Sequence, residues 1–104
     1  MSEKSIITRL QEEIEVMERH LRIMKIIADK GPIGIIKLSE MTGFPPHKVR
    51  YSLRILENHG LILPSSNGAF TTERAHQFIN DFKHTLHDMI ERLKKLEDAL
   101  NRPL

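Results

Sequence analysis

Side chains suited to binding anions are concentrated in one short stretch of the sequence, FPPHKVRYSLR at residues 44–54. The stretch contains five such side chains: His47, Lys48, Arg50, Tyr51 and Arg54. Arginine and lysine bind phosphate groups, and arginine also pairs with the edge of guanine in the major groove of DNA. The chain has 16 basic and 14 acidic residues and a net charge of only +2. The basic surface of this nearly neutral chain must therefore come from local clustering of these side chains. We expect double-stranded DNA as the partner.

The sequence lacks the patterns that would indicate an enzyme. It has no cysteine, no glycine-rich phosphate loop, no GxSxG and no HExxH. His84, His87 and Asp88 could share one helix face and raise a metal site as an alternative. They fall on the solvent side of a heptad pattern, which favours a solvated face. We expect no catalysis, no cofactor and no metal.

The spacing within residues 46–58 predicts a helix with two different faces. Pro46 suits the first helical position, where a missing N–H costs nothing. Val49, Leu53 and Leu56 follow i, i+4, i+7 spacing and predict the core face. The basic side chains then lie on the opposite side, with Arg50 and Lys48 at its flanks. The helix N-terminus would also offer free N–H groups to a phosphate.

Short elements surround this helix. Residues 35–42 predict a helix that Gly43 ends, and Phe44-Pro45 forms the turn between the two helices. Residues 61–63 and 69–71 predict short strands joined at an Asn67-Gly68 tight turn. Thr72 predicts the N-cap of a further helix.

Two long amphipathic helices flank these elements. An unbroken heptad stripe runs through residues 5–30, and another runs through residues 72–101. The positions in these stripes that we expect to form a homodimer are Ile7, Leu10, Ile14, Met17, Ile79, Phe82, Leu86, Met89, Leu93, Leu96 and Leu100. A monomer in which the two helices pack only on each other is the alternative, but it would leave much apolar surface in water.

Residues 35–62 resemble the winged helix-turn-helix of the MarR, ArsR and PadR type regulators. The shared pattern is Thr42-Gly43 after a short helix, Val49, Leu53 and Leu56 on the next helix, and then Gly60-Leu61-Ile62. The long C-terminal helix is also similar to that of small archaeal winged-helix chromatin proteins that dimerise through an antiparallel coiled coil.

The resemblance implies a mainly α fold with a small β-hairpin, in which long N- and C-terminal dimerisation helices flank the winged helix. We expect a single domain over residues 1–104, divided into 5–30, 31–71 and 72–101. The residues expected to contact DNA are Pro46, His47, Lys48, Arg50, Tyr51 and Arg54, with Ser65, Ser66 and Asn67 at the tip of the wing. That tip departs from the many winged helices that carry arginine or lysine there.

These observations predict a dimeric transcriptional regulator that reads the major groove with residues 46–58. Two alternatives stay open: a weakly specific architectural DNA-binding protein, and a winged helix that binds other proteins. A pocket for a small effector could lie between the long helices and the winged domain, but the sequence names no effector. The sequence also leaves open the operator, the regulated genes, activation or repression, and the orientation of the dimer helices. The absence of cysteine, of a secretory signal and of a long apolar run favours a soluble cytoplasmic protein without membrane contact.

Overall fold

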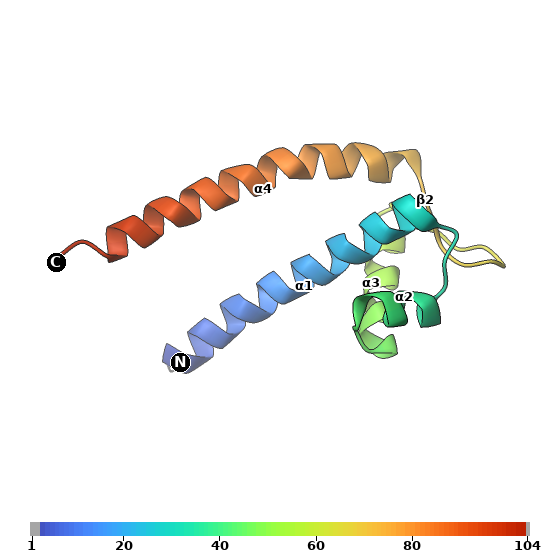
Figure 1. Ribbon diagram of the computed structural model, residues 1–104, viewed down its shortest axis with the longest axis horizontal. Coiled ribbons are helices and arrows are strands. Elements are labelled where there is room, and N and C mark those ends of the chain that lie inside the picture. The colour runs from blue at the N-terminus through green and yellow to red at the C-terminus, as the bar shows by residue number, and fades with distance from the viewer. Residues whose placement is uncertain (1–2, 104) are drawn as a thin grey trace.

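The computed structural model describes residues 3–103, and residues 1, 2 and 104 of the expected 1–104 domain lie outside the described residues. The fold is mainly α with a small antiparallel hairpin, as predicted. The elements follow the chain as α1 (Glu3–Lys30), α2 (Ile35–Thr42), α3 (Pro46–Asn58), β1 (Ile62–Leu63), β2 (Phe70–Thr71) and α4 (Glu73–Leu100). Figure 1 shows α1 and α4 extending from the unit of short elements toward the same end of the molecule, where both chain termini lie.

The core lies where the C-terminal half of α1 meets the short elements and the start of α4. Its buried apolar residues are Ile23, Met24, Ile27, Ile33, Leu38, Val49, Leu56, Leu61, Ile62 and Ala75. Leu53 and Ile79 are half-buried and pack against this cluster. Burial falls along α1 toward its N-terminus, from Met24 at 0% exposed to Ile14 at 54%. The core therefore covers one end of each long helix and leaves the other end uncovered.

The turn between α2 and α3 is held by side-chain hydrogen bonds. Gly43 ends α2 in the left-handed conformation, at φ 80°. The Thr42 hydroxyl oxygen accepts a hydrogen bond from the Phe44 N–H at 3.1 Å, and the Ser39 hydroxyl donates to the Phe44 carbonyl at 2.7 Å. These bonds fix the chain direction immediately before α3 begins at Pro46, the predicted first helical position.

The hairpin is smaller than predicted and is extended by an additional bridge. Ile62 pairs with Thr71, and Leu63 pairs with Phe70. Ala69 forms an antiparallel bridge with Ile33, a pairing that the sequence did not predict. Thr72 occupies the predicted N-cap position of α4, but its hydroxyl donates to the Gly60 carbonyl at 2.8 Å instead of capping the helix. Thr72 therefore ties the start of α4 to the chain that follows α3.

The predicted Asn67-Gly68 turn is shifted by one residue. The turn closes through hydrogen bonds between Ser65 and Gly68, so Ser66 and Asn67 are its central residues. Of the four residues in the turn, Gly68 is the one with a positive φ, 117°. A Cβ at Gly68 would lie 2.4 Å from the Ile33 carbonyl carbon. Glycine is thus required here both by the φ angle and by the closeness of the Ile33 backbone.

Candidate nucleic-acid interface

The two faces of α3 have opposite environments. Val49 and Ser52 are 0% exposed and Leu56 is 4% exposed on the inner face. All the side chains that the sequence predicts to contact DNA from this helix are exposed: Pro46, His47, Lys48, Arg50, Tyr51 and Arg54. The predicted separation of a core face from a basic face is therefore present. We call the exposed His47, Lys48, Arg50 and Arg54 the basic face of α3.

The basic face is not neutralised by acidic neighbours. The ion pairs among the described residues lie within α1 or within α4: Arg9–Glu13, Arg22–Glu18, Lys25–Asp29 and Lys94–Glu91. None of these pairs involves Lys48, Arg50 or Arg54. Because these guanidinium and ammonium groups form no ion pair within the described chain, an anion can bind them without an existing ion pair being broken.

Tyr51 lies at the border between this face and α1. Its ring centroid is 5.9 Å from that of His20 on α1, at an interplanar angle of 38°, and the residue is 46% exposed. One side of the ring thus packs on α1 while the rest meets solvent. This contact limits the movement of the ring.

The N-terminus of α3 offers fewer free N–H groups than the sequence suggested. Pro46 has no N–H, and the Lys48 N–H donates to the Pro45 carbonyl at 3.0 Å. Among these first positions, His47 is the one whose N–H has no hydrogen-bond partner in the described part of the chain. Binding of an anion here would therefore rely on side chains more than on the helix terminus.

At the hairpin tip, the predicted residues have different roles. The Ser65 hydroxyl donates to the Gly68 carbonyl at 2.6 Å, and its oxygen accepts from the Asn67 N–H at 3.2 Å. Ser65 is thus engaged in holding the turn. The side chains of Ser66 and Asn67 are exposed at the tip and carry no charge.

A buried polar cluster joins α1 to α3 and was not found from the sequence. The Ser52 hydroxyl oxygen accepts from Nε of Arg19 at 3.0 Å and lies 2.7 Å from Nδ1 of His20. Each polar atom in these two contacts has a hydrogen-bond partner if the Ser52 hydroxyl donates to Nδ1 of a neutral His20. Burial, with contributions from Arg19 and His59, lowers the pKa of His20 below its ordinary value. The sequence signal that could have indicated this cluster is a serine between Val49 and Leu56 on the core face of the helix.

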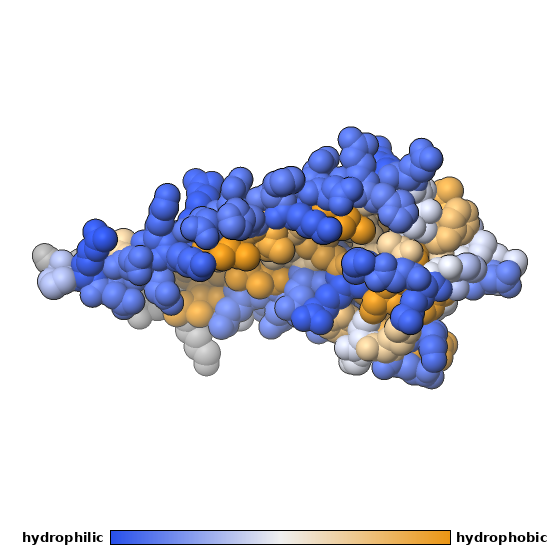
Figure 2. Space-filling model, turned by 45° about the horizontal axis from the view of Figure 1, so that its top comes forward, coloured by the Kyte–Doolittle hydropathy of each residue, from blue (hydrophilic) through white to orange (hydrophobic). Residues whose placement is uncertain are grey.

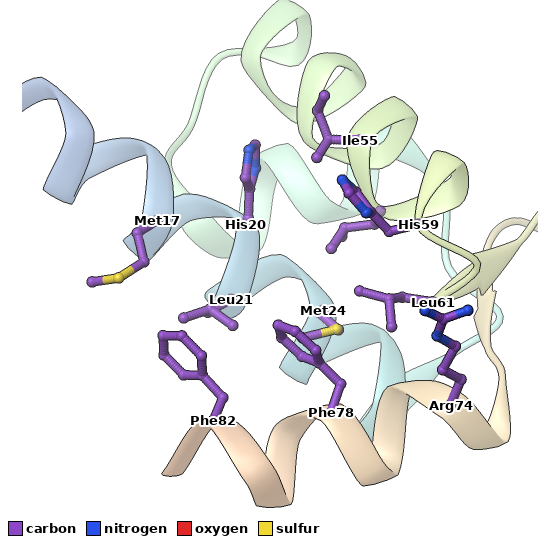
Figure 3. A pocket seen from close by; sticks show the side chains of 11 residues that line it. Met17, His20, Leu21, Met24, Ile55, His59, Leu61, Arg74, Phe78 and Phe82 are labelled. Atoms are coloured by element: carbon purple, nitrogen blue, oxygen red, sulfur yellow. The ribbon is translucent and has the colours of Figure 1, made fainter. Parts of the chain in front are cut away.

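A pocket of about 370 Å³ opens where α1, the end of α3 and the start of α4 meet. Its walls are mostly apolar side chains: Met17, Leu21, Met24, Ile55, Leu56, Leu61, Phe78 and Phe82. The polar groups that line it are His20, His59 and Arg74 (Figure 3). The pocket lies in the region where the sequence allowed an effector site, between the long helices and the short elements.

The uncovered ends of α1 and α4 present an apolar groove. Figure 2 shows a continuous hydrophobic band between flanking hydrophilic side chains along the long axis of the molecule. The stripe residues more than half exposed are Ile7, Leu10, Ile14, Leu93, Leu96 and Leu100. Leu86 and Met89 are less exposed, whereas Met17, Ile79 and Phe82 are half-buried within their own chain. The part of the stripes available to a partner is therefore their distal part.

His84 and His87 are exposed on α4, as the heptad pattern predicted. In the described part of the chain, no group of three or more His, Asp or Glu side chains is arranged to hold a metal ion. Across the same residues, no helix is both long and apolar enough to cross a membrane.

Comparisons with known proteins give a match in fold. No protein-family model matches the sequence, and no curated protein is significantly similar to it. Among solved structures, the chain is similar to the activation domain of the phage T4 transcription factor MotA, with a TM-score of 0.57 and 23% sequence identity. The similarity covers 74% of this chain and 81% of that domain. The chain thus shares its fold with a domain of a transcription factor.

Proposed function

We propose that this protein is a homodimeric DNA-binding regulator of transcription that places α3 in the major groove. The basic face of α3 carries the proposal, because its cationic side chains are exposed and have no acidic partner among the described ion pairs. An α-helix fits the width of the major groove, and arginine pairs there with guanine. The fold shared with a transcription-factor domain supports the same assignment.

The proposed dimer is supported by the apolar groove. Ile7, Leu10 and Ile14 on α1 are each 54–57% exposed, and Leu93, Leu96 and Leu100 on α4 are 54–76% exposed. Monomeric proteins rarely leave a continuous apolar band of this kind in water. A second copy related by a two-fold axis would cover both stripes in a helical bundle. The same axis would place two copies of α3 on successive turns of one DNA face.

The small net charge favours a specific regulator over an architectural DNA-binding protein. Binding without sequence preference depends mainly on charge, and the net charge here is only +2. The Ser66 and Asn67 side chains at the hairpin tip are uncharged, so α3 would make most of the sequence-reading contacts.

A second candidate function is binding to another protein of the transcription machinery. Leu63 and Phe70 are cross-strand partners on the outer side of the hairpin, and they are 47% and 39% exposed. Residues 61–71 contain no basic side chain. The structurally similar domain is named as the activation domain of a transcription factor.

Selection of bound sequences from a random pool of double-stranded DNA at physiological salt separates these functions. The regulator proposal predicts enrichment of one two-fold symmetric site, bound at least ~10³ times more tightly than random DNA. Binding without enrichment would identify an architectural protein. Absence of binding would reject both DNA-binding proposals and leave the protein-binding role of the hairpin.

A further inference from the structure

The pocket between α1, α3 and α4 combines an apolar wall with a cationic rim. Phe78 and Phe82 stack with ring centroids 5.8 Å apart and an interplanar angle of 17°, and they form the wall on the α4 side (Figure 3). Met17 and Met24 on α1 complete the apolar surface. Unbranched methionine side chains adapt to ligands of irregular shape. A pocket of about 370 Å³ is within the size range of small-molecule sites.

The polar groups of the pocket all carry nitrogen. His20 comes from α1, His59 follows the last turn of α3, and Arg74 comes from the first turn of α4. No aspartate or glutamate is among the lining residues, and no described ion pair engages Arg74. Its guanidinium lies close to Gly60, with Nη1 3.8 Å from the position of a Cβ on that residue. The rim thus offers hydrogen-bond donors and positive charge without a counter-ion from the described chain.

We propose that this pocket binds a small amphipathic organic anion, with its carboxylate at Arg74 and His59 and its apolar chain against Phe78, Phe82 and the methionines. Charge complementarity selects an anion, because a neutral or cationic head group would leave Arg74 unpaired or meet repulsion. The apolar wall requires that the ligand also carry a hydrocarbon part, because inorganic anions would leave that surface in contact with water. A medium-chain carboxylate is the simplest ligand of this class.

Isothermal titration calorimetry of the full chain with decanoate and with decan-1-ol tests the proposal, since the two probes share a chain and differ in the head group. We expect saturable binding of one decanoate per chain and weaker binding of decanol. Arg74→Gln should weaken decanoate by about fivefold, the change for ~1 kcal/mol at a solvent-exposed ion pair, and leave decanol unchanged. The matched control, Arg92→Gln on the exposed part of α4, should change neither affinity.

A second pair of variants tests the apolar wall. Phe78→Leu should weaken both probes, whereas Phe70→Leu on the hairpin should weaken neither, with circular dichroism confirming that each variant folds. Equal affinity for decanoate and decanol, an unchanged affinity of Arg74→Gln for decanoate, or binding that does not saturate would each overturn the proposal. The assay contains no DNA, so its outcome is independent of the DNA-binding proposal.

Discussion

The hydroxyl oxygen of Ser52 accepts a hydrogen bond of 3.0 Å from Nε of Arg19, and this bond joins the buried side of α3 to α1. Ser52 is 0% exposed and Arg19 is 8% exposed, and no described acidic side chain pairs with Arg19. The helix proposed to read DNA is thus attached through a polar contact to one of the helices proposed to form the dimer. The angle between these helices determines how the basic face of α3 is presented.

Replacement of Ser52 tests the contribution of this contact to stability. Ser52→Ala removes the acceptor of the Arg19 Nε–H in a buried environment, and such an unsatisfied donor costs about 1–3 kcal/mol. We expect the free energy of unfolding, measured by urea denaturation, to fall by that amount. Ser66→Ala at the exposed hairpin tip is the matched control and should be nearly neutral. Equal urea midpoints for the two variants would show that the cluster does not stabilise the fold.

The Ser52 contact also shows where sequence reasoning reached its limit. The ends of α2 and α3 and the presence of both long helices were predicted, because Gly43, Pro46 and the apolar spacing act within a few residues. Arg19 and Ser52 are 33 residues apart, and no local pattern indicates that two such positions meet. The Ile33–Ala69 bridge was missed for the same reason.

The turn and the cap show a different limit. Asn67-Gly68 has the composition of the two central residues of a turn, but the hydrogen bonds between Ser65 and Gly68 make Ser66 and Asn67 the central residues. Thr72 has the side chain of an N-cap, yet its hydroxyl bonds to Gly60. At Thr72 a tertiary contact therefore decided between two uses of the same side chain. The exposed basic face of α3 was predictable because it is what remains once the core face is assigned.

Stability is expected to depend on pH through His20. Burial first, then Arg19 and His59, lowers the pKa of His20 in the folded state below 6.5, and the Tyr51 ring also faces it. Because the folded state holds this proton more weakly than the unfolded state, His20 destabilises the fold as pH decreases below 6.5 toward the lowered pKa. Its contribution is fully favourable above pH 6.5.

Urea denaturation between pH 7.5 and pH 5.5, values chosen at about one unit on either side of the ordinary pKa, measures this dependence. We expect the loss of stability on acidification to be smaller in His20→Gln than in the wild-type protein. His84→Gln, which changes an exposed histidine of α4, should retain the wild-type dependence. The same pH dependence in all three proteins would rule out His20 as its source.

Replacement of Gly68 is predicted to destabilise the hairpin turn. Gly68→Ala places a Cβ at φ 117° and 2.4 Å from the Ile33 carbonyl carbon, so the Ile33–Ala69 bridge must shift. We expect a loss of at least about 1 kcal/mol in thermal or urea unfolding. Gly34→Ala is the control, because nothing lies within 4 Å of its Cβ position, and it should stay within about 0.5 kcal/mol of wild type. Similar stabilities of the two variants would contradict the turn geometry.

The apolar groove is predicted to hold the dimer together. Sedimentation velocity should give a dimer at micromolar concentration for the wild-type chain. Leu93→Gln, at a position that is 58% exposed in one chain, should raise the dimer dissociation constant at least ~tenfold through lost apolar burial. Lys95→Gln, two residues along the same helix, should have little effect. A wild-type monomer, or equal dissociation constants for both variants, would contradict the proposed interface.

The basic face of α3 is most directly tested by DNA-binding affinity as a function of salt. Fluorescence anisotropy with labelled double-stranded DNA would compare wild type, the double variant Arg50→Ala plus Arg54→Ala, and the charge-matched control Arg92→Ala plus Lys95→Ala on α4. We predict that the α3 double variant binds at least ~tenfold more weakly, with a shallower dependence of log affinity on log salt concentration, while the control resembles wild type. If the α3 variant keeps the wild-type affinity and salt dependence, α3 does not contact DNA.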